Sequence, residues 1–171
     1  MKERKSRRKR TSEQGEITSP ERRSVLVQSL AEHVETQDFE ITAIVKPDDA
    51  GLPEPQDRGG FRADIEAKDR NGRMLFGIIV TDEDLSLGNA PESSTENAGE
   101  APGASEADKC TLLSKKIKYF STLYMRDTKL PTILYIGYPR LSGVPARLKK
   151  LYVELGIDWK MKHILFVRID D

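Results

Sequence analysis

The sequence has little cysteine, few aromatic residues and no long apolar run. Cys110 is the only cysteine among 171 residues, so the chain cannot form an intramolecular disulfide and offers a zinc site no cysteine pair. No apolar stretch approaches the roughly 18 residues that cross a bilayer, and the N-terminus lacks the apolar segment of a secretory signal. We therefore expect a cytoplasmic protein without a membrane partner, whose fold depends on an apolar core.

A net charge of one sign is also absent, because 28 Lys and Arg balance 28 Asp and Glu. The charges are nevertheless segregated along the chain. Residues 1–10 carry seven bases and one acid, residues 82–108 carry eight acids and no base, and residues 109–171 carry thirteen bases and five acids. A neutral chain built from such blocks can present a basic surface to a polyanion.

Two segments have compositions that cannot form a core. The tail, residues 1–17, is strongly basic at its start, and residues 88–108 consist largely of Gly, Ala, Ser, Pro and Glu. We expect a disordered basic tail at 1–17 and a single α/β domain over 18–171, interrupted by a disordered acidic insertion at about 88–108. The tail is either a solubilising segment or an arm that binds phosphate or serves in targeting. The insertion is either a tolerated loop or an acidic mimic that covers a basic site.

Apolar periodicity predicts three helices. Ser19 and Pro20 form a typical helix start, and a stripe at spacings of four predicts a helix over about 20–36. A second helix follows the acidic insertion, and a third begins at a Ser142 cap and ends at Gly156. The stripes consist of Leu26, Leu30 and Val34; of Leu113, Ile117, Phe120 and Tyr124; and of Leu148, Leu151, Tyr152 and Leu155.

Five β-rich runs predict strands. The run at 61–68 alternates strictly, with Phe61, Ala63, Ile65 and Ala67 on one face. An Asn-Gly turn at 69–72 leads into an almost wholly apolar run, which predicts a central strand buried on both faces. The five predicted strands lie at 39–45, 61–68, 74–81, 132–138 and 163–169. The loop at 46–60 is dense in Pro, Gly and Asp.

The predicted order is helix-strand-strand-strand-helix-strand-helix-strand. A strand meander followed by two strand–helix–strand crossovers gives an α/β fold, with a mixed central sheet and helices on both faces.

This order resembles the core of the restriction-endonuclease-like nuclease superfamily, whose site follows the pattern Pro-Asp…(Asp/Glu)-x-Lys. The segment FRADIEAKDRNGRMLFGIIVTDEDL resembles the two active-site strands, and KIKYF followed by TILYIGYP resembles the next helix and strand. The resemblance covers roughly residues 20–87 and 109–171. It implies a restriction-endonuclease-like fold and, for an active member, a Mg²⁺-dependent nuclease.

The family's chemistry uses two carboxylates on adjacent strands to hold Mg²⁺, with a lysine beside the attacking water. The resemblance implies that Asp64 is the first carboxylate, and the metal ligand if the protein is active. The second carboxylate and the lysine would fall at about Ile78 and Val80, which cannot bind a cation. The site is therefore predicted to be degenerate, with no cofactor expected unless Mg²⁺ serves an active enzyme.

A second register remains open. Pro47-Asp48, followed after seventeen residues by Glu66-Ala67-Lys68, matches the family pattern by its letters. In this register the Glu-x-Lys strand would be followed by another strand, whereas the family places a helix there.

A relocated catalytic site is the third arrangement. Asp64, Glu66 and Lys68 fall on one strand face at intervals of about 7 Å. Acids from the first helix or strand can approach them: Glu32, Glu35 and Glu40. The alternative is that the face carrying Asp64, Glu66 and Lys68 is simply solvated, with ion pairs of little energetic weight.

Basic residues of the C-terminal half predict contacts with phosphates that do not read base sequence. They lie on the second and third predicted helices and their flanks: Lys115, Lys116, Lys118, Arg140, Arg147, Lys149 and Lys150, with Lys160 and Lys162 nearby. The same charges are also typical of a merely solvated helix face. Trp159 and His163 fit packing or edge positions better than a stacking platform or a metal ligand.

These observations predict a nucleic-acid-associated, DNA-binding protein of nuclease-like fold that is non-catalytic or has a degenerate metal site. Two other functions remain open. One is an active Mg²⁺-dependent endonuclease or exonuclease with relocated catalytic residues, and the other is a protein-interaction module that kept only the scaffold.

Overall fold

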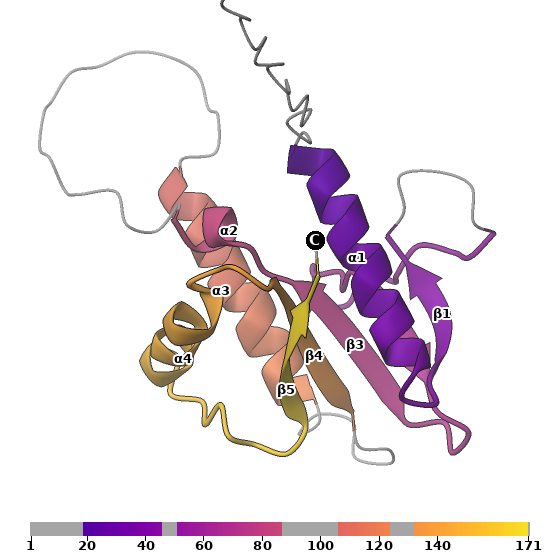
Figure 1. Cartoon of the computed structure of the whole chain (residues 1–171). Coiled ribbons are helices and arrows are strands. Elements are labelled where there is room, and N and C mark those ends of the chain that lie inside the picture. The colour runs from indigo at the N-terminus through magenta and orange to yellow at the C-terminus, as the bar shows by residue number, and fades with distance from the viewer. Residues whose placement is uncertain (1–18, 46–50, 87–105, 124–131, 171) are drawn as a thin grey trace, which may run out of the picture.

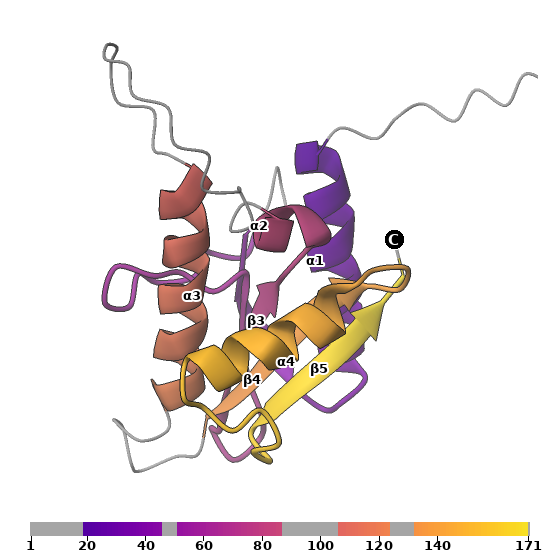
Figure 2. The ribbon, with the colours of Figure 1, turned by 90° about the vertical axis from the view of Figure 1, so that its left-hand side faces the viewer.

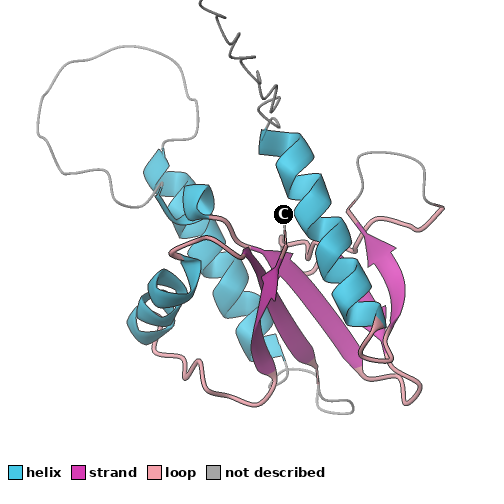
Figure 3. Ribbon diagram, viewed as in Figure 1, coloured by secondary structure: helices cyan, strands magenta, loops and turns pink. Residues whose placement is uncertain are grey.

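Over the residues that the computed structural model describes, five strands form one mixed sheet and four helices pack around it (Figure 1, Figure 3). The structure describes residues 19–45, 51–86, 106–123 and 132–170. Within them the elements are α1 Ser19–Glu35, β1 Glu40–Ile44, β2 Ile65–Lys68, β3 Met74–Ile79, α2 Asp82–Ser86, α3 Glu106–Thr122, β4 Ile133–Pro139, α4 Val144–Glu154 and β5 Ile164–Ile169.

The strands lie in the order in which they occur along the chain, from β1 to β5. The β1–β2 and β2–β3 pairs are antiparallel, and the β3–β4 and β4–β5 pairs are parallel. β3 is therefore the central strand, and five of its six residues are buried. The predicted α/β class, the mixed sheet and the central position of this strand are confirmed.

The β2–β3 turn forms at the predicted Asn-Gly position. Gly72 has a φ of +79°, and the Asp69 carboxylate accepts hydrogen bonds from the backbone N–H groups of Asn71 and Arg73 at 2.9 and 2.8 Å. The left-handed residue is the glycine, which carries no Cβ to oppose that conformation.

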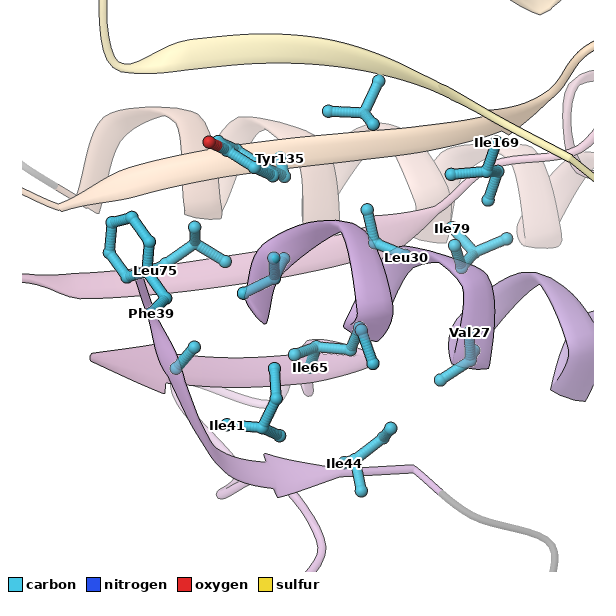
Figure 4. Packing of buried hydrophobic residues seen from close by; sticks show 14 of the residues in the cluster. Val27, Leu30, Phe39, Ile41, Ile44, Ile65, Leu75, Ile79, Tyr135 and Ile169 are labelled. Atoms are coloured by element: carbon cyan, nitrogen blue, oxygen red, sulfur yellow. The ribbon is translucent and has the colours of Figure 1, made fainter. Parts of the chain in front are cut away.

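One face of the sheet is covered by α1 (Figure 4). Leu26, Leu30 and Val34 of its predicted stripe are fully buried. Leu30 lies over two glycines of adjacent strands: a Cβ at Gly77 or at Gly137 would stand 3.1 Å from its Cδ2. The missing side chains allow the helix to approach the sheet this closely.

The other face carries a second apolar cluster, to which α2, α3 and α4 all contribute (Figure 2). Its buried helix residues are Leu85, Ile117, Phe120, Val144, Leu148 and Tyr152. The Tyr152 hydroxyl lies 2.6 Å from the Ser121 hydroxyl, so the one polar atom of this buried ring has a partner. Helices on both faces were predicted, and this arrangement is confirmed.

Three local predictions need correction. Ser142 does not cap α4: the N-cap is Gly143, and the Ser142 hydroxyl donates to the Pro139 carbonyl at 2.7 Å. The short helix α2 was not predicted. α3 begins at Glu106, so the last three residues of the predicted insertion are helical. Gly156 does follow α4 with a φ of +68°, as predicted.

The predictions for residues 1–17, for 88–105 and for Tyr124 lie outside the described residues. Among the helices that the structure describes, none has both the length and the apolar character of a membrane-crossing segment.

The contact of Leu30 with the glycines predicts that Gly137→Ala destabilises the fold by about 1–3 kcal/mol, because the new Cβ would also stand 2.9 Å from Ile79 Cδ1. Chemical denaturation measures this cost. Combining Gly137→Ala with Leu30→Ala should cost less than the sum of the two single changes. Strict additivity would show that Leu30 does not limit the space at Gly137.

Burial raises the pKa of Tyr152 to about 12, against the smaller opposing effect of its hydrogen bond to Ser121. Between pH 10 and 12 the unfolded chain therefore loses this proton first, and the folded state loses stability as the pH rises. The full effect of two pKa units is about 3 kcal/mol. We expect denaturant titrations of Tyr152→Phe to lack this alkaline component, and an identical pH dependence in both proteins would contradict the assignment.

Candidate functional site

Asp64 lies where the chain bends just before β2, next to the carboxyl end of β3. It is only 5% exposed, and its Oδ2 accepts a hydrogen bond from the backbone N–H of Ile79 at 2.8 Å. The bend places Phe61 and Ala63 against the cluster on the α3 side, although Ile65 and Ala67 face α1. The strict alternation predicted for 61–68 is therefore wrong before residue 65.

Arg23 brings the first cation to this carboxylate. Its position in the second turn of α1 lets the guanidinium reach the end of the sheet, where Nη2 lies 3.2 Å from Asp64 Oδ1 and 3.3 Å from the Ile79 carbonyl oxygen. Its Nη1 lies 3.3 Å from Asp84 Oδ2. One guanidinium thus bridges two carboxylates.

Asp84 is held by the start of α2. Thr81 precedes this helix, and the Asp84 carboxylate accepts from the Thr81 backbone N–H at 2.8 Å and from its hydroxyl at 3.0 Å. The Thr81 hydroxyl in turn accepts from the Asp84 N–H at 3.3 Å. This reciprocal arrangement is a capping box, and it fixes the second carboxylate beside Arg23.

Lys116 supplies the second cation, from α3 on the opposite face of the sheet. Its Nζ lies 3.8 Å from Asp64 Oδ2, and its side chain is 19% exposed. Three helices and the bend before β2 therefore meet at what we call the Asp64 cluster, which consists of Arg23, Asp64, Asp84 and Lys116.

The two cations of the Asp64 cluster respond differently to burial. Burial lowers the pKa of Lys116 below its usual value; Asp64 opposes this shift, and the charge on Arg23 adds to it. Burial also disfavours the charge of Arg23, but Asp64 and Asp84 outweigh it, so the pKa of Arg23 is raised. Arg23 is the permanent cation here, and Lys116 is the one brought closer to losing its proton.

A metal ion does not fit the residues of this cluster. Both carboxylates already accept from Arg23, and Asp64 also takes the Ile79 N–H and faces Lys116. No group of three or more His, Cys, Asp or Glu side chains among the described residues could hold a metal. A cavity of about 50 Å³ beside Arg23 is far smaller than the roughly 300 Å³ of a small ligand pocket.

The predicted trio Asp64, Glu66 and Lys68 does not form one site. Glu66 is 4% exposed and accepts from Arg58 Nε and from the Gln56 backbone N–H, both at 3.2 Å. Arg58 itself lies over the Phe76 ring, 5.1 Å from its centroid. Glu66 therefore fastens the loop before β2, and Lys68 is exposed at the far end of that strand.

The structure also bears on the second register of the nuclease pattern and on the relocated catalytic site. Pro47 and Asp48 lie outside the described residues, and the strand β3 follows Glu66-Ala67-Lys68. Glu32, Glu35 and Glu40 are all exposed, and Glu40 is the β1 partner of Lys68. The alternative that these side chains lie on a solvated strand face is wrong for Asp64 and Glu66, because both are buried.

Two of the predicted phosphate-binding residues are engaged inside the protein. Lys116 pairs with Asp64, and Arg147 donates to the carbonyl oxygens of Asp82 and Leu85, both at 3.4 Å, and so ties α4 to α2. The other five are exposed: Lys115, Lys118, Arg140, Lys149 and Lys150. Arg140 lies 3.6 Å from the exposed Asp170 carboxylate.

The sequence contained signals for the two residues of the cluster that were not singled out. Thr81-x-x-Asp84 is the spacing of a capping box. Arg23 continues the stripe of Leu26, Leu30 and Val34 toward the helix start, and a charge on a buried stripe calls for a buried partner.

Comparison with known proteins gives no relative: no protein-family model, curated protein or solved structure matches the chain.

The Asp64 cluster predicts that Asp64→Asn destabilises the protein by about 2–4 kcal/mol, since Arg23 and Lys116 would lose their shared partner. The estimate allows for the 38% exposure of Arg23, which screens part of the effect. Glu54→Gln, which breaks the exposed Glu54–Arg62 pair at 3.0 Å, is the control and should cost less than about 1 kcal/mol. Equal costs in thermal or chemical melts would contradict a structural role for the cluster.

Proposed function

We propose that the chain is a nucleic-acid-associated protein with a restriction-endonuclease-like fold in which internal ion pairs have replaced the metal site. The order of its elements, the meander β1–β3 and the following crossovers support the fold assignment. Ile78 and Val80, where the family has its second carboxylate and lysine, are fully buried apolar residues.

The non-catalytic part of the proposal rests on one observation: the carboxylate oxygens of Asp64 are already engaged by groups of the protein. A metal-dependent nuclease needs carboxylate oxygens that are free to bind a hydrated divalent cation. Here those oxygens accept from Ile79 and Arg23 and face Lys116. The bridging guanidinium supplies positive charge between the carboxylates without the open coordination positions that a metal would offer.

The nucleic-acid part of the proposal rests on exposed cations of two helices on the same face of the sheet. Lys115 and Lys118 project from α3, and Lys149 and Lys150 from α4. Residues 109–171 carry thirteen bases and five acids. Such cations bind phosphates and displace their counterions, which gives affinity without base specificity.

The proposal predicts an affinity for nucleic acid that falls steeply as salt rises. The joint change Lys149→Ala and Lys150→Ala should weaken binding and reduce the slope of log K against log salt by about 2, one for each lost phosphate contact. Titration of a labelled oligonucleotide across a salt series measures both. Arg70→Ala, which removes an exposed charge from the β2–β3 turn, is the matched control and should leave the slope unchanged.

Cleavage assays separate the proposal from an active nuclease. With Mg²⁺ present we expect intact DNA and RNA, at protein concentrations that saturate binding. Cleavage by the parent that is lost in a folded Asp64→Asn variant would overturn the non-catalytic assignment. Absence of any binding at low salt would instead leave the protein-interaction module as the function of this scaffold.

A further inference from the structure

The segment that joins α4 to β5 (Figure 2) contains Trp159, whose ring contacts aromatic and basic side chains. Its ring is partly exposed and stacks on Phe166, with 6.3 Å between centroids and 19° between planes. The ammonium groups of Lys149 and Lys160 lie over the same ring, 4.5 and 5.5 Å from its centroid. We call these four residues the Trp159 surface.

The rest of the fold holds this ring in place. Phe166 also contacts the buried Tyr152, 5.8 Å between centroids, so Trp159 is braced against the apolar cluster below it. The Asp158 carboxylate accepts from the Lys160 backbone N–H at 2.9 Å, and the Asp158 carbonyl accepts from the Met161 N–H at 3.3 Å. The aromatic platform is therefore preorganised, which lowers the entropic cost of binding to it.

The charges around the ring favour an anion. Residues 149–162 contain four lysines and two acids, Glu154 and Asp158. Among the described residues, no carboxylate forms an ion pair with Lys149 or Lys160, whose ammonium groups instead lie over an aromatic ring. A cation above a ring can move to a phosphate when one arrives, and this movement uncovers the ring.

We infer that the Trp159 surface binds single-stranded nucleic acid: an unpaired base stacks on Trp159 while Lys149 and Lys160 take the adjacent phosphates. The inference rests on the proposed function and adds the form of nucleic acid that is bound. A duplex keeps the faces of its bases stacked within the helix, so it would engage the lysines but not the ring. Stacking on an aromatic side chain needs no particular base, which agrees with the sequence-independent contacts of the lysines.

Tryptophan fluorescence measures this contact directly, because Trp159 is the only tryptophan of the sequence. Adding a short oligothymidylate to the full-length protein should quench the tryptophan fluorescence in a saturable way. A duplex of the same length and inorganic polyphosphate can move the lysines but cannot stack a base on the ring, so they should change the fluorescence much less. Equal quenching by polyphosphate would overturn the inference, since it would show that the ring senses only the movement of the lysines.

Substitutions test the energetic role of the ring. Trp159→Ala should weaken binding of the single strand about tenfold or more, and leave duplex binding unchanged. Trp159→Phe retains an aromatic surface and the packing on Phe166, so it should keep most of the affinity even if the alanine variant folds poorly. Lys150→Ala is the matched control: its side chain neighbours Lys149 in sequence, and its loss should weaken single-strand and duplex binding equally.

The outcomes distinguish this inference from the function on which it rests. Binding of both forms with equal affinity, unaffected by Trp159→Phe and by Trp159→Ala, would overturn the single-strand inference and leave the proposed function standing. Quenching by an acidic peptide as strong as that by oligothymidylate would also overturn it, because the surface would then recognise any polyanion. The absence of binding to any nucleic acid would overturn both.

Discussion

A carboxylate withdrawn from water at the end of the sheet imposes the main constraint on this molecule. The cost of burying the Asp64 carboxylate is offset by a backbone N–H of β3, by Arg23 of α1 and by Lys116 of α3, all of which face it. Through Arg23 the constraint extends to Asp84 and α2. The arrangement links both helical layers to one end of the sheet, and apolar packing, which has no direction, could not specify that link by itself.

Long periodic elements were predictable from the sequence because their own residues determine them. Leu26, Leu30 and Val34 indicate both a helix and its buried side, and the apolar run of β3 indicates a central strand. The topology followed, since a tight turn produces an antiparallel pair and a crossover helix produces a parallel pair.

Features that depend on partners distant in sequence could not be predicted in the same way. The bend at Asp64 accompanies the hydrogen bond that its carboxylate accepts from the N–H of Ile79, fifteen residues later. Gly143 caps α4 without a side-chain bond, and its N–H instead meets the Asp82 carboxylate at 3.2 Å, which displaces Ser142 from its expected role. Lys116 reads as one of several surface lysines on its helix, and only the tertiary structure turns it toward an acid.

The cations that the structure describes include two groups with different surroundings. Arg23, Arg58, Lys116 and Arg147 join elements of the fold, each through a carboxylate or carbonyl of the protein itself. Lys115, Lys118 and Lys150 are exposed, and the exposed Lys149 places its ammonium group over the Trp159 ring. The number of basic residues in the sequence therefore overstates the basic surface. Some of these residues form ion pairs with buried carboxylates inside the molecule. The basic surface formed by the described residues is correspondingly smaller and more localised.

The close packing of Leu30 over Gly77 and Gly137 limits the movement of α1 along its own axis. A helix packed on a uniform apolar sheet can slide along its axis at little cost, whereas a methyl group lodged over two glycines fixes its axial position. Arg23 stands seven residues, or about 10.5 Å, before Leu30 on nearly the same side of the helix. Steric exclusion in the apolar core, and not charge alone, therefore determines how far the Arg23 guanidinium lies from Asp64 and Asp84.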